Sequence, residues 1–419
     1  IGLVGSEMCI RDRYEVVYTN RMSAGAYRGY GATQGIFAVE STVNKLADRL
    51  SMDPIVLRQK NMIHEGDVMP AYYGETANSC RLEECLLKAS DMIGWKEKGM
   101  RTVMPDGKIR ARGVAMAMQG SSISNCDVGS VTVKLSDEGT YHITVGCTDM
   151  GTGCDTIIAQ FAADVLETPI DNISVYGVDT DISPYDSGSY ASSTTYLTGM
   201  AAVKACEQLR EHIIALAAAR MNKDASALTF DGENVIDESD GSKMSLFDIA
   251  TASMCNNEIS MEVTYSHSSP VSPPPFMAAC AEVEVDPETG AIELLDYTAC
   301  VDCGTVVNTN LARVQTEGGL LQGIGMTLYE DIWYDERGKN LSNSFMQYKV
   351  PSRLDTDRIR VEFDSSYEPT GPFGAKSIGE IVINTPAPAI ADAVYNATGV
   401  WINELPITPE KILKGMQVI

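Results

Sequence analysis

Residues 371–390 read GPFGAKSIGEIVINTPAPAI, in which a run of small residues ends at Glu380 and the apolar residues 381–383 follow. Glycine-rich junctions that lead into a helix expose unpaired backbone N–H groups, and these bind anions or polar cofactors. A carboxylate between glycine and an apolar segment is a candidate general base, because apolar surroundings make a carboxylate more basic. From the residues alone, an N-cap or surface glutamate is the alternative.

Three further runs of small or hydroxylated residues lead toward expected helices, at residues 29–35, 151–153 and 187–193. Most glycine-rich loops are only turns, so one such run is a weak indication, but four in one chain favour a ligand site built from loops. Two phosphate-binding motifs are excluded. The segment GYGATQG at 29–35 lacks the dinucleotide spacing, and GAKS at 374–377 lacks the glycine that precedes the lysine of a P-loop.

Arg28 stands between two aromatic residues in the segment AYRGYG, residues 26–31. Its guanidinium can donate a fork of hydrogen bonds to a phosphate or a polar heterocycle, and Tyr30 can stack on a flat substrate. An arginine that stacks on tyrosine for structural reasons is the alternative.

The chain is strongly acidic. Its 419 residues carry 32 basic and 57 acidic side chains, which gives a net charge of −25. This charge argues against nucleic acid as a partner and against binding to an anionic membrane surface. No apolar run reaches the length of a bilayer span. The length predicts two or three domains.

The cysteines and histidines exclude several metal sites. Eleven cysteines cannot all pair within one chain, so we expect reduced thiols and a cytoplasmic location. Cys300 and Cys303 form a C-x-x-C motif without a second pair, and buried thiols are a better interpretation than a zinc or redox site. The spacing of an iron–sulfur protein is missing, so any such cluster must lie on another chain. The four histidines are too scattered for zinc.

The hydrophobic pattern predicts an α+β fold with strands and helices in blocks. At helical spacing, Ile36, Phe37, Val39 and Leu46 mark the face of the first helix that we expect to be buried. We expect linkers at residues 103–112 and 222–245. We expect the chain after residue 398 to form an extended tail. The expected helices are 33–50, 54–61, 82–93, 156–166, 195–221, 312–328 and 388–398, and the expected strands are 131–135, 141–145, 259–265, 280–285 and 292–301.

Residues 1–13, IGLVGSEMCIRDR, do not fit a signal peptide, because the charged residues follow the apolar ones. We expect a non-native or junction segment joined to an internal part of a longer protein.

Taken in order, the motifs resemble those of the molybdenum-binding subunit of the xanthine dehydrogenase and aldehyde oxidase family, and within it bacterial xanthine dehydrogenase subunits. The likeness extends from about residue 14 to the end. It is carried by AYRGYGATQ at 26–34, GCTDMGTGCDT at 146–156, GSYASSTTYLTG at 188–199, DCGTVVNTNLARVQTEGG at 302–319, residues 371–390 and ELPITPEK at 404–411.

The resemblance implies a molybdopterin-binding α+β fold with mixed sheets and helices in two lobes. Residues 14–112 would be the C-terminal part of a first molybdopterin-binding domain, and residues 113–419 a second one. The family's full-length subunits are longer on the N-terminal side, so we expect this chain to be the C-terminal half and to be inactive alone.

The resemblance also assigns roles to individual residues. Glu380 matches the catalytic carboxylate, which takes a proton from the oxygen that attacks an electron-poor substrate carbon. The positions matching cofactor contacts are Arg28, Gly29, Gly151, Thr152, Gly153, Ala191, Ser192 and Gln315, and those matching substrate contacts are Arg28, Tyr30, Gln119, Gly120 and Ser121. No side chain would bind the metal directly, because the pterin dithiolene holds the molybdenum.

By resemblance, the enzyme would hydroxylate a heteroaromatic substrate such as xanthine or hypoxanthine with a molybdenum-molybdopterin cofactor in its cytosine dinucleotide form. Electrons would pass to 2Fe-2S and FAD centres on partner subunits, in a dimer of heterotrimers. Aldehyde, nicotinate or aromatic acyl-CoA substrates, or a non-catalytic scaffold, are the alternatives.

Two departures from the family pattern bear on these roles. Thr152 stands where the family turn usually has glutamine, so one side-chain contact to the pterin differs. Purine-oxidising relatives can hold the substrate between two aromatic rings. Tyr30 would be one of them, but residues 119–122 supply no second ring.

Overall fold

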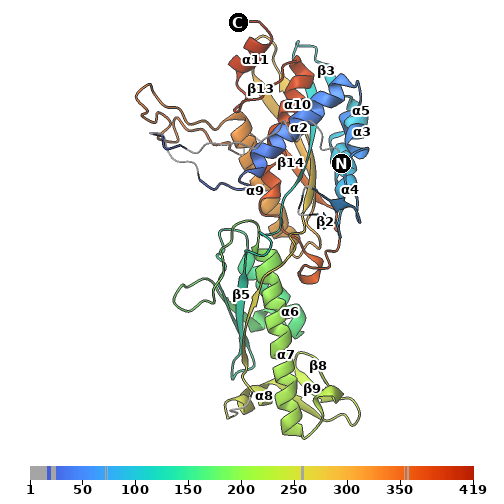
Figure 1. Cartoon of the computed structure of the whole chain (residues 1–419), viewed down its shortest axis with the longest axis vertical. Coiled ribbons are helices and arrows are strands. Elements are labelled where there is room, and N and C mark those ends of the chain that lie inside the picture. Colours follow the sequence, from blue (N-terminus) through green and yellow to red (C-terminus); the bar gives the residue numbers. More distant parts are fainter. Residues whose placement is uncertain are drawn as a thin grey trace.

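The computed structural model describes residues 17–19, 25–70, 72, 74–255, 259–352, 354–355 and 358–419. These residues form two lobes, one above the other in Figure 1, each with a sheet covered by helices. The expected α+β fold with mixed sheets in two lobes is therefore confirmed. The expected junction segment 1–13 lies outside the described residues. None of the described helices combines the length and the apolar character needed to cross a bilayer.

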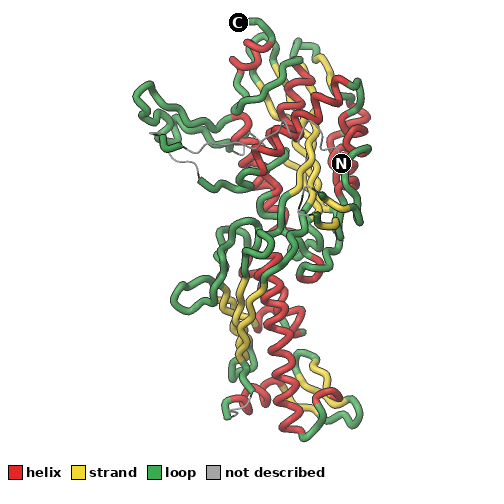
Figure 2. Tube along the Cα trace, viewed as in Figure 1, coloured by secondary structure: helices red, strands yellow, loops and turns green. Residues whose placement is uncertain are grey.

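The upper lobe is organised around a five-stranded sheet with the strand order β14-β13-β12-β4-β3. β13 and β14 are parallel, and the other neighbours are antiparallel. The helices α10, α2 and α9 pack together against this sheet, as the red helices around the yellow strands in Figure 2 show. The strands are β3 (Arg101–Val103), β4 (Ile109–Met118), β12 (Phe276–Val285), β13 (Ile292–Asp302) and β14 (Ile359–Phe363), and the helices are α2 (Ala32–Arg49), α3 (Pro54–Gln59), α4 (Leu82–Ile93), α5 (Trp95–Lys98), α9 (Thr309–Leu328) and α10 (Pro386–Thr398).

The central strand β12 is buried along its whole length. Because side chains alternate between the faces of a strand, Met277 and Ala279 pack into the cluster that contains α10, whereas Ala278 and Cys280 pack into the cluster that contains α4. A strand covered on both faces favours apolar or small residues, and the segment FMAACA at 276–281 supplies them. Glu282, which follows, is buried in an ion pair with Arg112.

Gly113 in β4 allows α10 to approach the sheet closely. A Cβ at this position would lie 2.2 Å from Ala389 O and 2.3 Å from Ala393 N. We expect Gly113→Ala to lower the free energy of unfolding by about 1–3 kcal/mol, because the helix backbone cannot yield locally. Urea denaturation of the purified chain measures this. Gly35→Ala is the control, since no atom would lie within 4 Å of its Cβ, and equal stability of the two variants would contradict the prediction.

The lower lobe contains a four-stranded sheet with the order β11-β5-β6-β7, on which α6 and α7 pack. The strands predicted at 131–135 and 141–145 are confirmed as parts of β5 and β6, which pair antiparallel through Val131↔Val145 and Leu135↔Tyr141. At the far end of α7, a small three-stranded sheet and α8 form the base of Figure 1. The elements are β5 (Gly129–Leu135), β6 (Tyr141–Val145), α6 (Cys154–Leu166), β7 (Ile173–Tyr176), α7 (Gly199–Met221), β8 (Leu228–Phe230), β9 (Asn234–Asp237), β10 (Lys243–Ser245), α8 (Leu246–Ser253) and β11 (Glu262–His267).

Three segments that we expected to lack regular structure contain it. Residues 103–112 include the end of β3 and the start of β4, where Lys108 and Arg110 both bind Glu284 on the neighbouring strand. In the sequence, these charged residues gave the segment the composition of a polar linker, because their partner on the other strand is distant in the chain. Residues 222–245 contain β8, β9 and β10. The tail contains α11 (Pro409–Gly415), which follows the cap residue Thr408.

The first helix occurs where it was predicted, and its predicted buried face is correct only in part. Ile36 and Phe37 pack against the core of the upper lobe. Val39 is 57% exposed and Leu46 48%, whereas Glu40 and Asn44 are buried. Glu40 binds Arg58 through a buried ion pair of 2.6 Å, and Asn44 donates to Val114 O at 3.2 Å. Specific polar partners in β4 and α3 therefore override the apolar stripe of α2.

Asp392 in α10 provides a pH-dependent contribution to stability. It is buried and accepts a hydrogen bond from Val114 N at 3.1 Å. Burial raises the pKa of the Asp392 carboxyl to about 7, although the Arg58 charge opposes the shift. The folded chain binds this proton more tightly than the unfolded chain. The contribution is therefore fully present below the unfolded pKa and is lost as the pH rises through the folded value.

We expect Asp392→Asn to gain free energy of unfolding relative to the wild type as the pH is raised from 5 to 8, since asparagine cannot ionise. A tenfold change in proton affinity corresponds to about 1.4 kcal/mol. Urea denaturation of both proteins at each pH gives this difference. A difference that does not change with pH would contradict the assignment.

Candidate active site between the lobes

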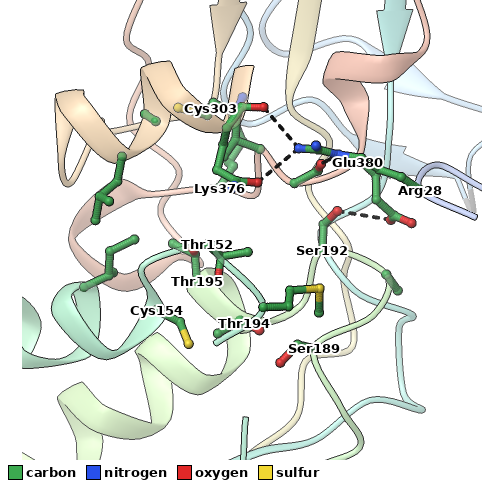
Figure 3. Close-up of a pocket in the computed structure, with 18 of the residues that line it drawn as sticks. Arg28, Thr152, Cys154, Ser189, Ser192, Thr194, Thr195, Cys303, Lys376 and Glu380 are labelled. Atoms are coloured by element: carbon green, nitrogen blue, oxygen red, sulfur yellow. Dashed lines mark hydrogen bonds between the residues drawn. The ribbon is translucent and has the colours of Figure 1, made fainter. Parts of the chain in front are cut away.

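A cavity of about 490 Å³ lies where the two lobes meet. Figure 3 shows its walls, to which both lobes contribute. The charged residues among those that line it are Arg28, Lys376 and Glu380, and the rest are neutral. The predicted site residues on the wall are Arg28, Tyr30, Thr152, Ala191, Ser192, Gln315 and Glu380.

Glu380 is held at the cavity wall by one group from each lobe. It stands at the N-cap position of the short helix η5 (Ile381–Ile383), but its side chain makes no cap hydrogen bond. Instead, Oε1 accepts from Gly29 N at 3.1 Å and Oε2 accepts from Ser192 Oγ at 3.1 Å, as Figure 3 shows for Ser192. The carboxylate is therefore oriented into the cavity and keeps free lone pairs for a proton.

Position 29 requires glycine, because there is no room for a side chain. Its φ is +70°, and a Cβ would lie 2.9 Å from Ile383 Cγ2 and 3.0 Å from Asn384 Oδ1. Glycine adopts this conformation without steric cost, and it brings the Gly29 N–H to the carboxylate of Glu380.

Arg28 links the segments around the cavity. Nε donates to Gly379 O at 2.5 Å, Nη1 to Gln322 at 3.2 Å, and Nη2 to both the backbone and the side-chain oxygen of Gln315 at 3.2 and 3.1 Å. Burial lowers the pKa of Arg28, and the Glu380 charge opposes this. These four hydrogen bonds engage most of the guanidinium donors, so Arg28 holds together the segments that carry Gly379, Gln315 and Gln322. A direct contact of Arg28 with the substrate remains a prediction.

Gln315 extends this network to the turn of residues 151–153. Its Nε2 donates to Gly151 O at 2.9 Å, and Asp149 Oδ1 closes the turn by accepting from Gly151 N and Gly153 N. A Cβ on Gly153 would lie 2.6 Å from Leu311 Cδ1, which explains the second glycine. Two of the predicted cofactor contacts thus lie in direct contact with each other.

Ala191 and Ser192 form a strained turn beside Glu380. Both have a positive φ, of 52° and 57°, which is unusual for residues other than glycine. Within the described residues, neither backbone N–H donates to a protein acceptor. Successive N–H groups of this kind form an anion- or oxygen-binding concavity. Together with the Gln315 amide and the cavity volume, they fit a polar organic cofactor.

Gln119, Gly120 and Ser121 do not reach the cavity wall. Ser121 is completely buried, and its Oγ contacts Ser377 Oγ at 2.9 Å, while Gln119 accepts from Asn384 Nδ2 at 2.8 Å. These residues support the segment that carries Glu380 from behind. Their predicted substrate contact stays a prediction.

The sequence interpretation missed a buried ion pair under the cavity. Lys376 Nζ lies 2.9 Å from Asp302 Oδ2, and both side chains have zero exposure. Lys376 also donates to Ser79 O, and Asp302 accepts from Gly304 N and Ser366 Oγ. Both residues lie inside the quoted family motifs, so only their pairing was hidden.

The thiols follow the prediction. Cys300 and Cys303 are free and buried. Asp149, Cys154 and Asp155 are close enough to share a cation, but Asp149 Oδ1 already accepts the two turn hydrogen bonds. That the cofactor, and no side chain, holds the metal stays a prediction of the resemblance.

Two models of the molybdopterin cofactor-binding domain match the chain, over residues 9–62 and 88–357. The chain therefore belongs to the molybdopterin cofactor-binding domain family. These domains are those of a molybdenum-binding subunit in the xanthine dehydrogenase and aldehyde oxidase family. The division of the two domains at residue 112 remains a prediction.

Particular relatives agree with this class. The chain is 37% identical to the protein named "Probable hypoxanthine oxidase XdhD" of Escherichia coli K12, over 96% of this chain and 43% of the relative. It is 33% identical to the xanthine dehydrogenase molybdenum-binding subunit of Escherichia coli O157:H7, over 94% and 54%. The structure of quinoline 2-oxidoreductase from Pseudomonas putida 86 matches with a TM-score of 0.83 and 25% identity, over 94% and 53%. The chain thus spans about half the length of these relatives.

Proposed function

We propose that the full-length protein is a molybdenum hydroxylase that oxidises a purine, such as xanthine or hypoxanthine, or a similar N-heterocycle, with oxygen derived from water. Electrons would pass to 2Fe-2S and FAD centres on partner chains of a cytoplasmic dimer of heterotrimers. The pterin would carry the cytosine dinucleotide form. The three relatives above support this substrate class, because each is named for a reaction on an N-heterocycle.

The geometry of Glu380 carries the proposal. Among the described residues, the Glu380 side chain neither caps a helix nor forms an ion pair, and groups from both lobes orient it into one cavity. A non-catalytic scaffold would not require it. A positioned carboxylate within reach of a reacting group is the arrangement that general base catalysis needs.

When bound, the molybdenum cofactor would supply the two-electron redox chemistry. The chain would supply binding and a base. Gln315, the turn at 151–153 and the N–H groups of Ala191 and Ser192 would hold the pterin, and Glu380 would take up a proton on a carboxylate oxygen. Gly29 N and Ser192 Oγ keep that carboxylate in place while its charge changes.

An aldehyde, nicotinate or aromatic acyl-CoA substrate is the alternative within the same family. It is favoured by the position of residues 119–121, which contribute no aromatic ring to the cavity wall.

A substrate screen of the intact complex tests the proposal. The full-length protein, purified with its partner subunits, is assayed with hypoxanthine, xanthine and aldehydes, and its molybdenum and pterin contents are measured. We expect both components to be present and the heterocycles to be turned over with the higher kcat/KM. Turnover of aldehydes alone would favour the alternative, and an absence of molybdenum would favour a scaffold.

A further inference from the structure

A second aromatic ring reaches the cavity from the lower lobe. Tyr190 lines the cavity with 43% of its surface exposed, and Tyr30, which comes from the upper lobe, is 48% exposed. Tyr190 follows Ser189 in the sequence, and Figure 3 labels Ser189 on the cavity wall. The two tyrosines therefore line one cavity from two separate parts of the chain.

The Tyr190 ring is fixed in position. Its hydroxyl donates to Asp127 Oδ1 at 2.8 Å, and the other oxygen of Asp127 accepts from Ile123 N at 2.7 Å. Asp127 is buried, so the anchor does not move with the surface. The hydrogen bond to Asp127 raises the pKa of Tyr190 to about 12, so the hydroxyl remains a donor at neutral pH. A ring tethered at its far end loses little conformational entropy when a ligand stacks on it.

Both rings are close in sequence to the groups that hold Glu380. Tyr190 precedes Ser192, the donor to Oε2, by two residues, and Tyr30 follows Gly29, the donor to Oε1, by one. Both tyrosines therefore line the same cavity as the carboxylate of Glu380. An aliphatic aldehyde has no aromatic face and would gain nothing from these rings.

We propose that Tyr190 is a stacking residue that, together with Tyr30, selects flat aromatic N-heterocycles over aliphatic aldehydes. This inference rests on the proposed function and names the residue that sets its substrate class. The second ring that residues 119–122 do not provide thus comes from a different loop on the opposite lobe.

The test uses the full-length complex with Glu380→Gln, which is expected to bind but not to turn over substrate. Isothermal titration calorimetry with hypoxanthine gives Kd in this background with Tyr190 intact, with Tyr190→Ala, with Tyr190→Leu and with Tyr190→Phe. Stacking on one aromatic side chain supports an increase in Kd of about tenfold for the alanine and leucine variants. Phenylalanine keeps the ring and should remain within about threefold. Molybdenum content shows whether each variant is assembled.

The outcomes are distinct. A Kd for assembled Tyr190→Leu that equals the value with Tyr190 intact would overturn the stacking role while leaving the proposed function in place. An equal loss in the leucine and phenylalanine variants would also overturn it, because the hydroxyl and not the ring would then matter. If the complex with Tyr190 intact binds neither hypoxanthine nor xanthine nor quinoline, the proposed function itself fails.

Discussion

Glu380→Gln is expected to lower kcat of the full-length complex by about 100- to 10,000-fold, the range lost when a general base is removed. Glutamine keeps the size of the side chain and can still accept from Gly29 N, which lies 3.1 Å from Oε1, but it cannot take up the proton. The hydrogen bonds of Gln315 with Arg28 and with Gly151 are not altered, so the molybdenum content should remain at the wild-type level.

Steady-state turnover and elemental analysis of the same preparation measure both effects. Glu404→Gln is a matched control, because the Glu404 side chain is 85% exposed and its ion pair with Lys411 is long, at 3.9 Å. It should retain wild-type kcat. Full turnover by Glu380→Gln would defeat the assignment of the base, and a parallel loss of molybdenum would indicate a structural role.

Asp302→Ala is expected to lower the free energy of unfolding by about 3–5 kcal/mol, the usual cost of removing one partner of a buried ion pair. The Lys376 ammonium has zero exposure, and after the substitution it would keep the Ser79 carbonyl as a hydrogen-bond acceptor but no carboxylate. Gly304 N and Ser366 Oγ would also lose their acceptor. Urea denaturation of the purified chain gives the change.

The double variant Asp302→Leu with Lys376→Met separates charge from packing. Replacing both partners by apolar residues should recover most of the lost stability, because no buried charge is left without a partner. Glu207→Ala at the surface pair Lys204–Glu207 is the second control and should cost less than about 1 kcal/mol. A loss for Asp302→Ala no greater than that of Glu207→Ala would contradict the importance of the pair.

Much of the fold was predictable because its signals are local. The strand predicted at 292–301 occurs as β13, and the helix predicted at 82–93 occurs as α4. Alternation and amphipathic spacing depend on the segment itself. The outward face of α2 was not predictable, because it depends on Arg58 and Val114, which are distant in sequence and offer polar partners to Glu40 and Asn44.

The site was predictable where family motifs mark it, and was missed elsewhere. Arg28 and Glu380 are 352 positions apart, and their shared cavity follows from motif resemblance and not from periodicity. Gln322 lies outside the quoted motifs, and Tyr190 lies inside the motif at 188–199 but was assigned no role there. Both are identified by their side-chain partners, Arg28 and Asp127. Residues 119–121 were placed at the substrate by resemblance, and that contact stays a prediction. In the structure, Ser121 and Gln119 contact the segment that carries Glu380.

The two hydrogen bonds of Glu380 come from separate lobes, Gly29 from the upper and Ser192 from the lower. The position of the Glu380 carboxylate therefore depends on how the two lobes are aligned. A displacement of about 1 Å at a reacting group can cost about a hundredfold in rate. Substitutions far from the cavity that tilt one lobe should then slow catalysis as effectively as changes at the wall.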